Sequence, residues 1–215
     1  MLNLVLASAS PRRRELLVQA GYSFQVHPAH IPEDPHPAED PIAYVVRLAR
    51  EKAETVFREL VLKGHGPVPS GRRAESDSER VWALTPEGIL PETLTVLGAD
   101  TTVVLDNQIL GKPEDPADAA RMLRLLSGRT HRVITGVAIV TDTRTEVAAE
   151  VTAVKFLTLS DQEIAAYIAT GEPMDKAGAY AIQGRAARWI PRIEGDYFNV
   201  VGLPLALVST LLEAR

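Results

Sequence analysis

The first residues that could do chemistry are the arginines at 12–14, which follow a serine-rich turn at the start of the chain. A short apolar run at 2–7 leads through Ser8 to a predicted helix, with Ser10 as its N-cap and Pro11 as its first residue. Free backbone N–H groups and the helix dipole favour an anion at such a turn, and arginine binds phosphate oxygens well. A phosphate site and an exposed basic turn are both open interpretations.

Asp100 is a candidate for acid–base or metal chemistry. It follows the apolar strand predicted for 94–97, and ligand sites of open α/β sheets lie at the carboxyl ends of strands. A carboxylate there can hold Mg²⁺ or take a proton from water, and it can equally organise the following turn through its side chain. Glu33 lies in an acidic loop, where a glutamate is usually only solvated.

Lys52 lies on or beside the apolar stripe of the helix predicted for 41–62, in which Val45, Ala49 and Val56 recur at steps of three and four. Its ammonium group must therefore extend past the stripe to water or meet a partner. Extension to water is the commoner of these two arrangements. If the ammonium group instead meets a partner, a nucleotide phosphate is one candidate.

Two more lysines and one glutamine complete the candidates. Lys112 is a single cation in the 111–113 loop, and Lys176 follows Asp175, with which it can form a simple ion pair. Gln183 can offer both a donor and an acceptor to the edge of a base.

The elements that must position these residues predict an α/β fold, with a sheet covered by helices. Strands are expected at 2–7, 22–27, 94–97, 103–105, 130–141 and 145–158, with a hairpin turn at 106–107. Helices are expected from Pro11 to near Gly21, over 41–62, from Asp115 or Asp118 to Leu126, over 161–169 after Ser160, and from Pro204 onward. The stretch 175–186 is expected to be irregular.

Length and composition suit one globular domain over 1–215, with a surface insertion at 63–93 that is rich in glycine and proline. The net charge of −5 argues against a general nucleic-acid binder, because that affinity comes from excess lysine and arginine. The absence of cysteine excludes disulfides, thiolate catalysis and Cys-ligated zinc. Without a signal-like start or a long apolar run, we expect no membrane contact and a cytoplasmic location.

Six blocks of sequence together resemble the Maf family of nucleotide pyrophosphatases. They are LASASPRRRELL at 6–17, RLAREKA at 47–53, GADT at 98–101, GKP at 111–113, DKAGAYAIQG at 175–184 and VGLP at 201–204. The blocks occur in the family's order, and the resemblance covers almost the whole chain outside 63–93.

This resemblance implies hydrolysis of a nucleoside triphosphate between the α and β phosphates with a divalent metal, Mg²⁺ or Mn²⁺. It implies a mixed, elongated sheet flanked by helices in a Maf/ITPase-like fold of two lobes with a central cleft. Asp100 would activate the attacking water and contact the metal, with Glu33 as a second metal ligand. The triphosphate would be held by Ser8, Arg13, Lys52 and Lys112. Lys176 is a further candidate site residue without an assigned role.

Three positions that match the family's specificity residues favour dTTP and UTP as substrates. Arg12, Thr101 and Gln183 resemble the dTTP/UTP branch, whereas the branch similar to 7-methyl-GTP pyrophosphatases carries a bulky aromatic residue, a glutamine and a glutamate. A neutral glutamine can pair with a pyrimidine edge, while a glutamate suits a cationic methylated guanine. A purine-directed enzyme and a nucleotide-sensing regulator of septum formation are the alternatives, and a homodimer is compatible with the resemblance.

Overall fold

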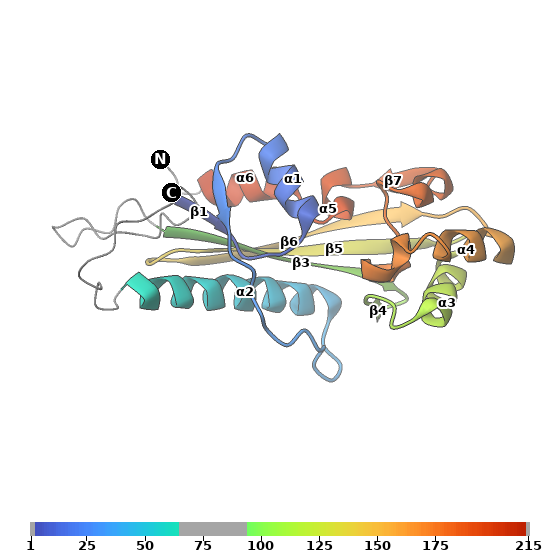
Figure 1. Ribbon diagram of the computed structural model, residues 1–215, viewed down its shortest axis with the longest axis horizontal. Helices are drawn as coiled ribbons and strands as arrows, with labels where there is room; N and C mark the ends of the chain where they lie inside the picture. The colour runs from blue at the N-terminus through green and yellow to red at the C-terminus, as the bar shows by residue number, and fades with distance from the viewer. Residues whose placement is uncertain (1–2, 65–93, 214–215) are drawn as a thin grey trace, which may run out of the picture.

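The computed structural model describes residues 3–64 and 94–213, which form a mixed sheet of seven strands covered by helices (Figure 1). The strand order is β2-β1-β3-β5-β6-β7, and β4 pairs with β3 off this path. β1 is parallel to β2 and β3, and the remaining pairs are antiparallel. The strands are Asn3–Leu6 (β1), Phe24–Val26 (β2), Leu94–Leu105 (β3), Gln108–Leu110 (β4), Thr130–Val140 (β5), Thr145–Lys155 (β6) and Arg192–Glu194 (β7).

Helices lie on both faces of the long strands, as Figure 1 shows: α2 runs along one face, and α1, α5 and α6 lie on the other. The helices are Pro11–Gln19 (α1), Pro41–Gly64 (α2), Pro116–Leu126 (α3), Asp161–Ile168 (α4), Tyr197–Val201 (α5) and Leu205–Glu213 (α6). Short 3₁₀ turns at Glu172–Asp175, Ala177–Ala179 and Arg185–Trp189 follow α4. Within 3–64 and 94–213, no helix has the length and apolar character that crossing a bilayer requires.

The predicted helix starts are confirmed. Ser10 is the N-cap of α1, and Asp115 rather than Asp118 is the N-cap of α3, where its side chain accepts from the Asp118 backbone N–H. Ser160 forms a capping box with Glu163 at the start of α4. Each cap satisfies a backbone N–H that the helix itself leaves unpaired, which explains why these short polar residues begin the helices.

The alternation of side chains along β3 separates two layers of the core. Leu97 and Ala99 pack in the layer that contains Leu17 of α1 and Val208 of α6. Val96 points to the opposite face and packs with Ala53 of α2. Because neighbouring strand residues face opposite ways, Asp100 lies on the α2 face and Thr101 on the α1 face.

Two glycines let α2 lie unusually close to the sheet. A Cβ atom on Gly98 would lie 2.1 Å from the Ala49 carbonyl oxygen, and one on Gly136 would lie 2.3 Å from the Val45 carbonyl oxygen. Gly136 is the register partner of Asp100 in the β3–β5 pair. The absence of a side chain at these positions therefore brings the backbone of α2 down beside Asp100.

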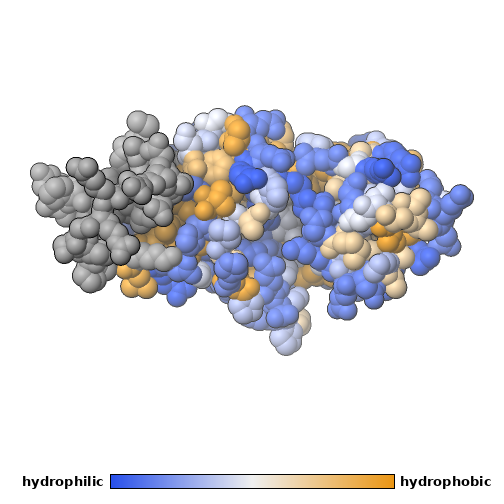
Figure 2. Space-filling view, viewed as in Figure 1, coloured by the Kyte–Doolittle hydropathy of each residue, from blue (hydrophilic) through white to orange (hydrophobic). Residues whose placement is uncertain are grey.

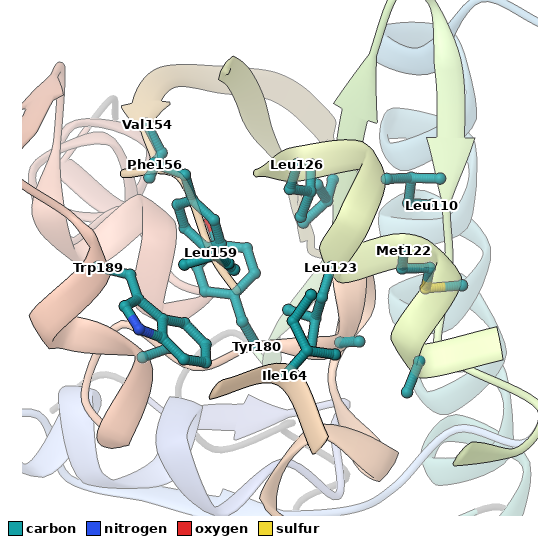
Figure 3. Close-up of a cluster of buried hydrophobic side chains, with 14 of the residues drawn as sticks. Leu110, Met122, Leu123, Leu126, Val154, Phe156, Leu159, Ile164, Tyr180 and Trp189 are labelled. Carbon is teal, nitrogen blue, oxygen red and sulfur yellow. The ribbon is translucent and has the colours of Figure 1, made fainter. Parts of the chain in front are cut away.

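A third part of the core lies around α3 and α4, which are at one end of the molecule in Figure 1, and its side chains are drawn in Figure 3. Its centre includes Phe156, Tyr180 and Trp189, and the rings of Phe156 and Tyr180 meet edge to face at 4.8 Å between centroids. Leu123 and Leu126 of α3 pack in the same cluster. This cluster supports the irregular segment that follows α4, which was predicted as irregular and consists of 3₁₀ turns.

The surface carries no single large apolar feature on the face seen in Figure 2, where polar side chains separate small apolar patches. Among the described residues, the exposed large hydrophobic side chains are spread over five elements and one loop: Val18, Val26, Ile42, Leu62, Val147, Leu157 and Tyr197. Scattered exposure of this kind is ordinary for a folded protein.

The prediction that a strand ends just before Asp100 is wrong. β3 is continuous from Leu94 to Leu105, and Asp100 lies near its middle. The physical reason is that β5 pairs with β3 without a break from Val96 to Val104, so the intervening residues stay extended.

Two short elements were not predicted. β7 has three residues and α5 has five, which is too short for a periodic pattern in the sequence. The predicted insertion at 63–93 lies outside the described residues, apart from the last two residues of α2.

Candidate active site

A pocket of about 800 Å³ is lined by all ten residues that the sequence predicts for the site. They are Ser8, Arg12, Arg13, Glu33, Lys52, Asp100, Thr101, Lys112, Lys176 and Gln183. A second cavity of about 530 Å³ lies between α3 and α4, and its lining is mainly apolar and includes none of these residues. The fold thus brings every predicted site residue to one place.

The floor of the pocket is a stretch of β3 between two partner strands. β1 pairs with β3 as far as Leu97, and β4 pairs with it from Val103 onward. Between these points, the Ala99 carbonyl oxygen accepts a hydrogen bond of 2.9 Å from Arg13 Nη1. On the edge of β3 that is not paired with β5, Asp100 and its neighbours therefore face side chains rather than another strand.

Lys52 joins two carboxylates at this floor. Its Nζ lies 2.7 Å from Asp100 Oδ1 and 2.6 Å from Glu33 Oε1. The side chains of Lys52 and Asp100 are 9% and 10% exposed, whereas Glu33 is 51% exposed. Of the two alternatives left open by the sequence, Lys52 meets partners rather than extending to water, because the close packing of α2 on the sheet buries it against Asp100. We call these three residues the carboxylate centre.

The two carboxylates of the centre differ in proton affinity. Burial raises the pKa of Asp100, and this effect outweighs the opposing influence of Lys52 and Arg13. Burial also acts to raise the pKa of Glu33, but the hydrogen bond and charge of Lys52 outweigh it, so the pKa of Glu33 is lowered. Asp100 is therefore the better proton acceptor of the pair, while Glu33 stays ionised to lower pH.

The loop that carries Glu33 is attached to the first turns of α2. Tyr44 donates from its hydroxyl to the Glu33 carbonyl oxygen at 2.8 Å, and Arg47 Nη2 donates to the Asp34 carbonyl oxygen at 3.2 Å. Arg47 also pairs with Glu39 at 2.7 Å, and this hydrogen bond lowers the pKa of Glu39 to about 2. Sequence reasoning did not identify these supports, although Arg47 belongs to the second family-like block.

Arg13 is largely occupied inside the chain. Its Nε donates to the Gly202 carbonyl oxygen at 2.8 Å, and its Nη2 donates to Thr101 Oγ1 at 3.0 Å. Its Nη1 donates to Ser8 Oγ at 3.1 Å as well as to the Ala99 carbonyl. Within the described residues, four of the five N–H groups of this guanidinium are thus used, so Arg13 joins α1, β3 and the C-cap of α5 and keeps one N–H for a ligand.

The segment 175–183 forms another wall of the pocket. Arg12 Nη1 lies 3.8 Å from Asp175 Oδ2, and Lys176 pairs with Asp175 as the simple interpretation predicted. Lys112 and Gln183 are exposed residues of the lining. Cations therefore approach this pocket from α1, from the 111–113 loop and from the 3₁₀ segment.

A buried histidine lies behind this wall. His131 is 2% exposed, and its Nε2 lies 2.7 Å from the hydroxyl of Tyr180, which lines the pocket. Its Nδ1 has no hydrogen-bond partner in the described part of the chain. Burial lowers the pKa of His131 to about 4, so the ring is neutral near pH 7.

Comparisons with known proteins match this chain over nearly its full length. A family described as Maf-like protein matches residues 3–215. A dTTP/UTP pyrophosphatase of Koribacter versatilis (strain Ellin345) is 48% identical over 212 residues, which are 99% of this chain and 94% of the relative. Proteins of the same name from Geobacter metallireducens and Bacillus pumilus are 49% and 42% identical, over 95% and 99% of this chain and 92% and 96% of their own lengths.

Proposed function

The chain belongs to the Maf family, and from this premise we propose that it is a nucleoside triphosphate pyrophosphatase that hydrolyses dTTP and UTP. The products are the nucleoside monophosphate and pyrophosphate, which suits removal of unwanted pyrimidine nucleotides. The observation that carries the proposal is the carboxylate centre, in which one ammonium group bridges Asp100 and Glu33 at the floor of a pocket lined by further cations.

Asp100 is proposed as the general base. It accepts a proton from a water molecule whose oxygen attacks the α-phosphorus, and the bond from that phosphorus to the bridging oxygen breaks as pyrophosphate leaves. Its raised pKa suits this role, because a base with a pKa nearer to the working pH accepts a proton more readily. Lys52 holds the Asp100 carboxylate in place and supplies positive charge beside the reacting phosphate.

Asp100 and Glu33 are also the residues proposed to hold Mg²⁺ or Mn²⁺. They fit a divalent cation because both carboxylates already contact one cationic group, the Lys52 ammonium. Among the described residues there is no cluster of three or more histidine, cysteine or acidic ligands, which agrees with Mg²⁺ sites that use one or two carboxylates together with substrate phosphates. When bound, such an ion would stabilise charge on the phosphate oxygens.

The remaining residues of the pocket are assigned to the substrate. Ser8, Lys52, Lys112 and the free N–H of Arg13 would bind the triphosphate, with Lys176 as a further cation. Arg12, Thr101 and Gln183 would select the base. Thr101 Oγ1 lies 3.0 Å from Thr135 Oγ1 and accepts from Arg13, so it acts as part of a fixed wall.

We also propose a single domain over 1–215 with two lobes. In this proposal one lobe would contain the core cluster around α3 and α4, the other would contain the clusters beside α1, α2 and α6, and the pocket would lie between them. A homodimer is a further proposal, which sedimentation of the purified protein would test.

The purified protein should be incubated with Mg²⁺ or Mn²⁺ and a panel of canonical nucleoside triphosphates plus 7-methyl-GTP. Conversion of dTTP and UTP to monophosphate and pyrophosphate is the expected result, and chromatography resolves these products. Preferred conversion of 7-methyl-GTP or another purine nucleotide would overturn the specificity. An absence of turnover would overturn the enzymatic proposal and favour a nucleotide-sensing regulator of cell division.

A further inference from the structure

Gln183 sits in a tight turn at the wall of the pocket. The Gly184 backbone N–H donates to the Ala181 carbonyl oxygen at 3.1 Å, which closes a four-residue turn over 181–184. Gln183 is the third residue of this turn, and Ala181 and Gln183 both line the pocket. We call this feature the Gln183 turn. Its position decides where the glutamine amide meets a bound base.

Two side chains hold the ends of the Gln183 turn. The Ala181 N–H donates to the Tyr167 hydroxyl oxygen at 3.3 Å, and the Arg185 N–H donates to Glu172 Oε1 at 3.1 Å. The same Tyr167 hydroxyl donates to Glu172 Oε1 at 2.8 Å. Tyr167 and Glu172 therefore form a hydrogen-bonded pair, here called the turn clamp, which accepts hydrogen bonds from the backbone on both sides of Gln183.

Gly184 makes room for this clamp. A Cβ atom at position 184 would lie only 1.8 Å from Glu172 Oε1. The φ angle of Gly184 is −100°, which other residues adopt freely, so a side chain at this position would act by displacing the Glu172 carboxylate rather than by straining the backbone. The carboxylate therefore occupies the space that a side chain at position 184 would take.

The clamp is anchored in the core and stands apart from the ligand. Tyr167 is 1% exposed, and its ring meets that of Trp189 edge to face at 5.1 Å in the cluster around α3 and α4. Neither Tyr167 nor Glu172 is among the described residues that line the pocket. Any influence of the clamp on the substrate must therefore pass through the backbone of the turn.

We propose that Tyr167 and Glu172 are positioning residues that give Gln183 its selectivity for a pyrimidine over a guanine, an inference that rests on the proposed function. Uracil and guanine both present an N–H donor beside a carbonyl acceptor, so one glutamine amide can pair with either base. The larger guanine carries this edge farther from the sugar. If the turn is held at a fixed place, Gln183 can pair with the edge of uracil, which lies nearer to the sugar, and has no room for the edge of guanine, which lies farther away.

The test compares kcat/KM for UTP and GTP in Tyr167→Phe, Glu172→Ala and Glu172→Gln. The phenylalanine keeps the buried ring and removes only the hydroxyl, and the glutamine keeps an acceptor for the Arg185 N–H. We expect the preference for UTP over GTP to fall about tenfold in Tyr167→Phe and Glu172→Ala, with kcat for UTP largely kept, and to be retained in Glu172→Gln. An unchanged preference in the first two variants would overturn the proposal.

A double variant and a matched control separate positioning from general destabilisation. If the clamp acts only through Gln183, adding Glu172→Ala to Gln183→Ala should cause no further loss of preference. Additive losses would contradict this route. Ser160→Ala removes the N-cap of the helix that carries Tyr167 without touching the turn, and it should lower the melting temperature while leaving the preference intact.

Amide hydrogen exchange tests the clamp without any catalytic assay. Exchange of the Arg185 N–H should become at least tenfold faster in Glu172→Ala, because its acceptor is removed, and should not change in Ser160→Ala. Equal exchange in wild type and Glu172→Ala would overturn the positioning role. Should the wild-type protein hydrolyse neither dTTP nor UTP, the proposed function would fail, while exchange at Arg185 would still decide whether the clamp orders the turn.

Discussion

The carboxylate centre and the Gln183 turn lie in one pocket but are held by different kinds of contact. At the centre, three ionisable side chains meet through an ammonium group, and two of them are almost fully buried. At the turn, backbone N–H groups donate to Tyr167 and Glu172, and these bonds set the place of the backbone that carries the exposed Gln183 side chain. The first arrangement can stabilise developing charge, whereas the second can only set a position.

This difference predicts a separation of effects along the pocket. Charges interact strongly in a buried site, so changes at the centre should alter the rate of the chemical step. Hydrogen bonds that fix a turn change the placement of the base, so changes there should alter the choice of substrate.

The strongest test of the separation is Asp100→Asn, which should lower kcat for UTP by about 10³-fold. Asparagine keeps the shape of the side chain and an oxygen that accepts from Lys52, but it cannot take up the proton from water. Circular dichroism and thermal unfolding should show a retained fold. The relative binding of UTP and GTP should not change, and a variant that kept the full rate would remove Asp100 from the role of base.

The local parts of this structure were predictable from the sequence. Helix caps such as Ser10 and Ser160, and the turn at 106–107, depend on residues next to one another. Asp106 and Asn107 adopt φ angles of 49° and 64° in that turn, as these residue types tolerate. Nine of the ten pocket residues lie in the blocks that resemble a family, and Glu33, outside those blocks, was assigned only through what the resemblance implies.

The supports of those residues were not predictable in the same way. Tyr44 and Glu172 use ordinary side chains to hold backbone groups of other loops, and no spacing in the sequence marks such contacts. The position of Asp100 within β3 was also missed, because the unbroken pairing with β5 depends on a strand some thirty-five residues later. Long-range packing therefore overrode the local pattern at the centre of the site.

A fall in pH should change the contributions of His131 and Asp100 to the free energy of unfolding in opposite directions. The pKa of His131 is about 4 in the fold and near 6.5 in the unfolded chain, so the unfolded state binds more protons between these values. Its stabilising contribution is complete above about pH 6.5 and is lost as the pH falls through 4, a change of about 3 kcal/mol. The raised pKa of Asp100 has the reverse sign, with stability present in acid and lost as the pH rises.

Urea unfolding at pH 7 and pH 4 measures this effect. The wild-type protein should lose more free energy of unfolding than His131→Gln, in which the side chain at 131 no longer titrates but can still bond to Tyr180. The exposed residue His36, changed to glutamine, is the matched control and should lose as much free energy of unfolding between pH 7 and pH 4 as the wild type. Equal slopes in wild type and His131→Gln would show that the buried histidine does not govern the acid response.

The smallest expected effect concerns the packing that places Lys52. Gly136→Ala would put a Cβ atom 2.3 Å from the Val45 carbonyl oxygen, so α2 must move away from the sheet. We expect a loss of about 1–3 kcal/mol in the free energy of unfolding, since overpacking a tight interface strains it. Lys52 should move with the helix, so kcat for UTP should fall while the preference over GTP stays.

Gly111→Ala provides the control for stability, because a Cβ atom there would meet no atom within 4 Å. It should unfold at nearly the wild-type urea concentration. If Gly136→Ala kept both its stability and its rate, close packing of α2 would not be what sets the carboxylate centre. If it instead changed the preference between UTP and GTP, the two parts of the pocket would be coupled. The idea that the carboxylate centre sets the rate and the Gln183 turn sets the substrate preference would then be wrong.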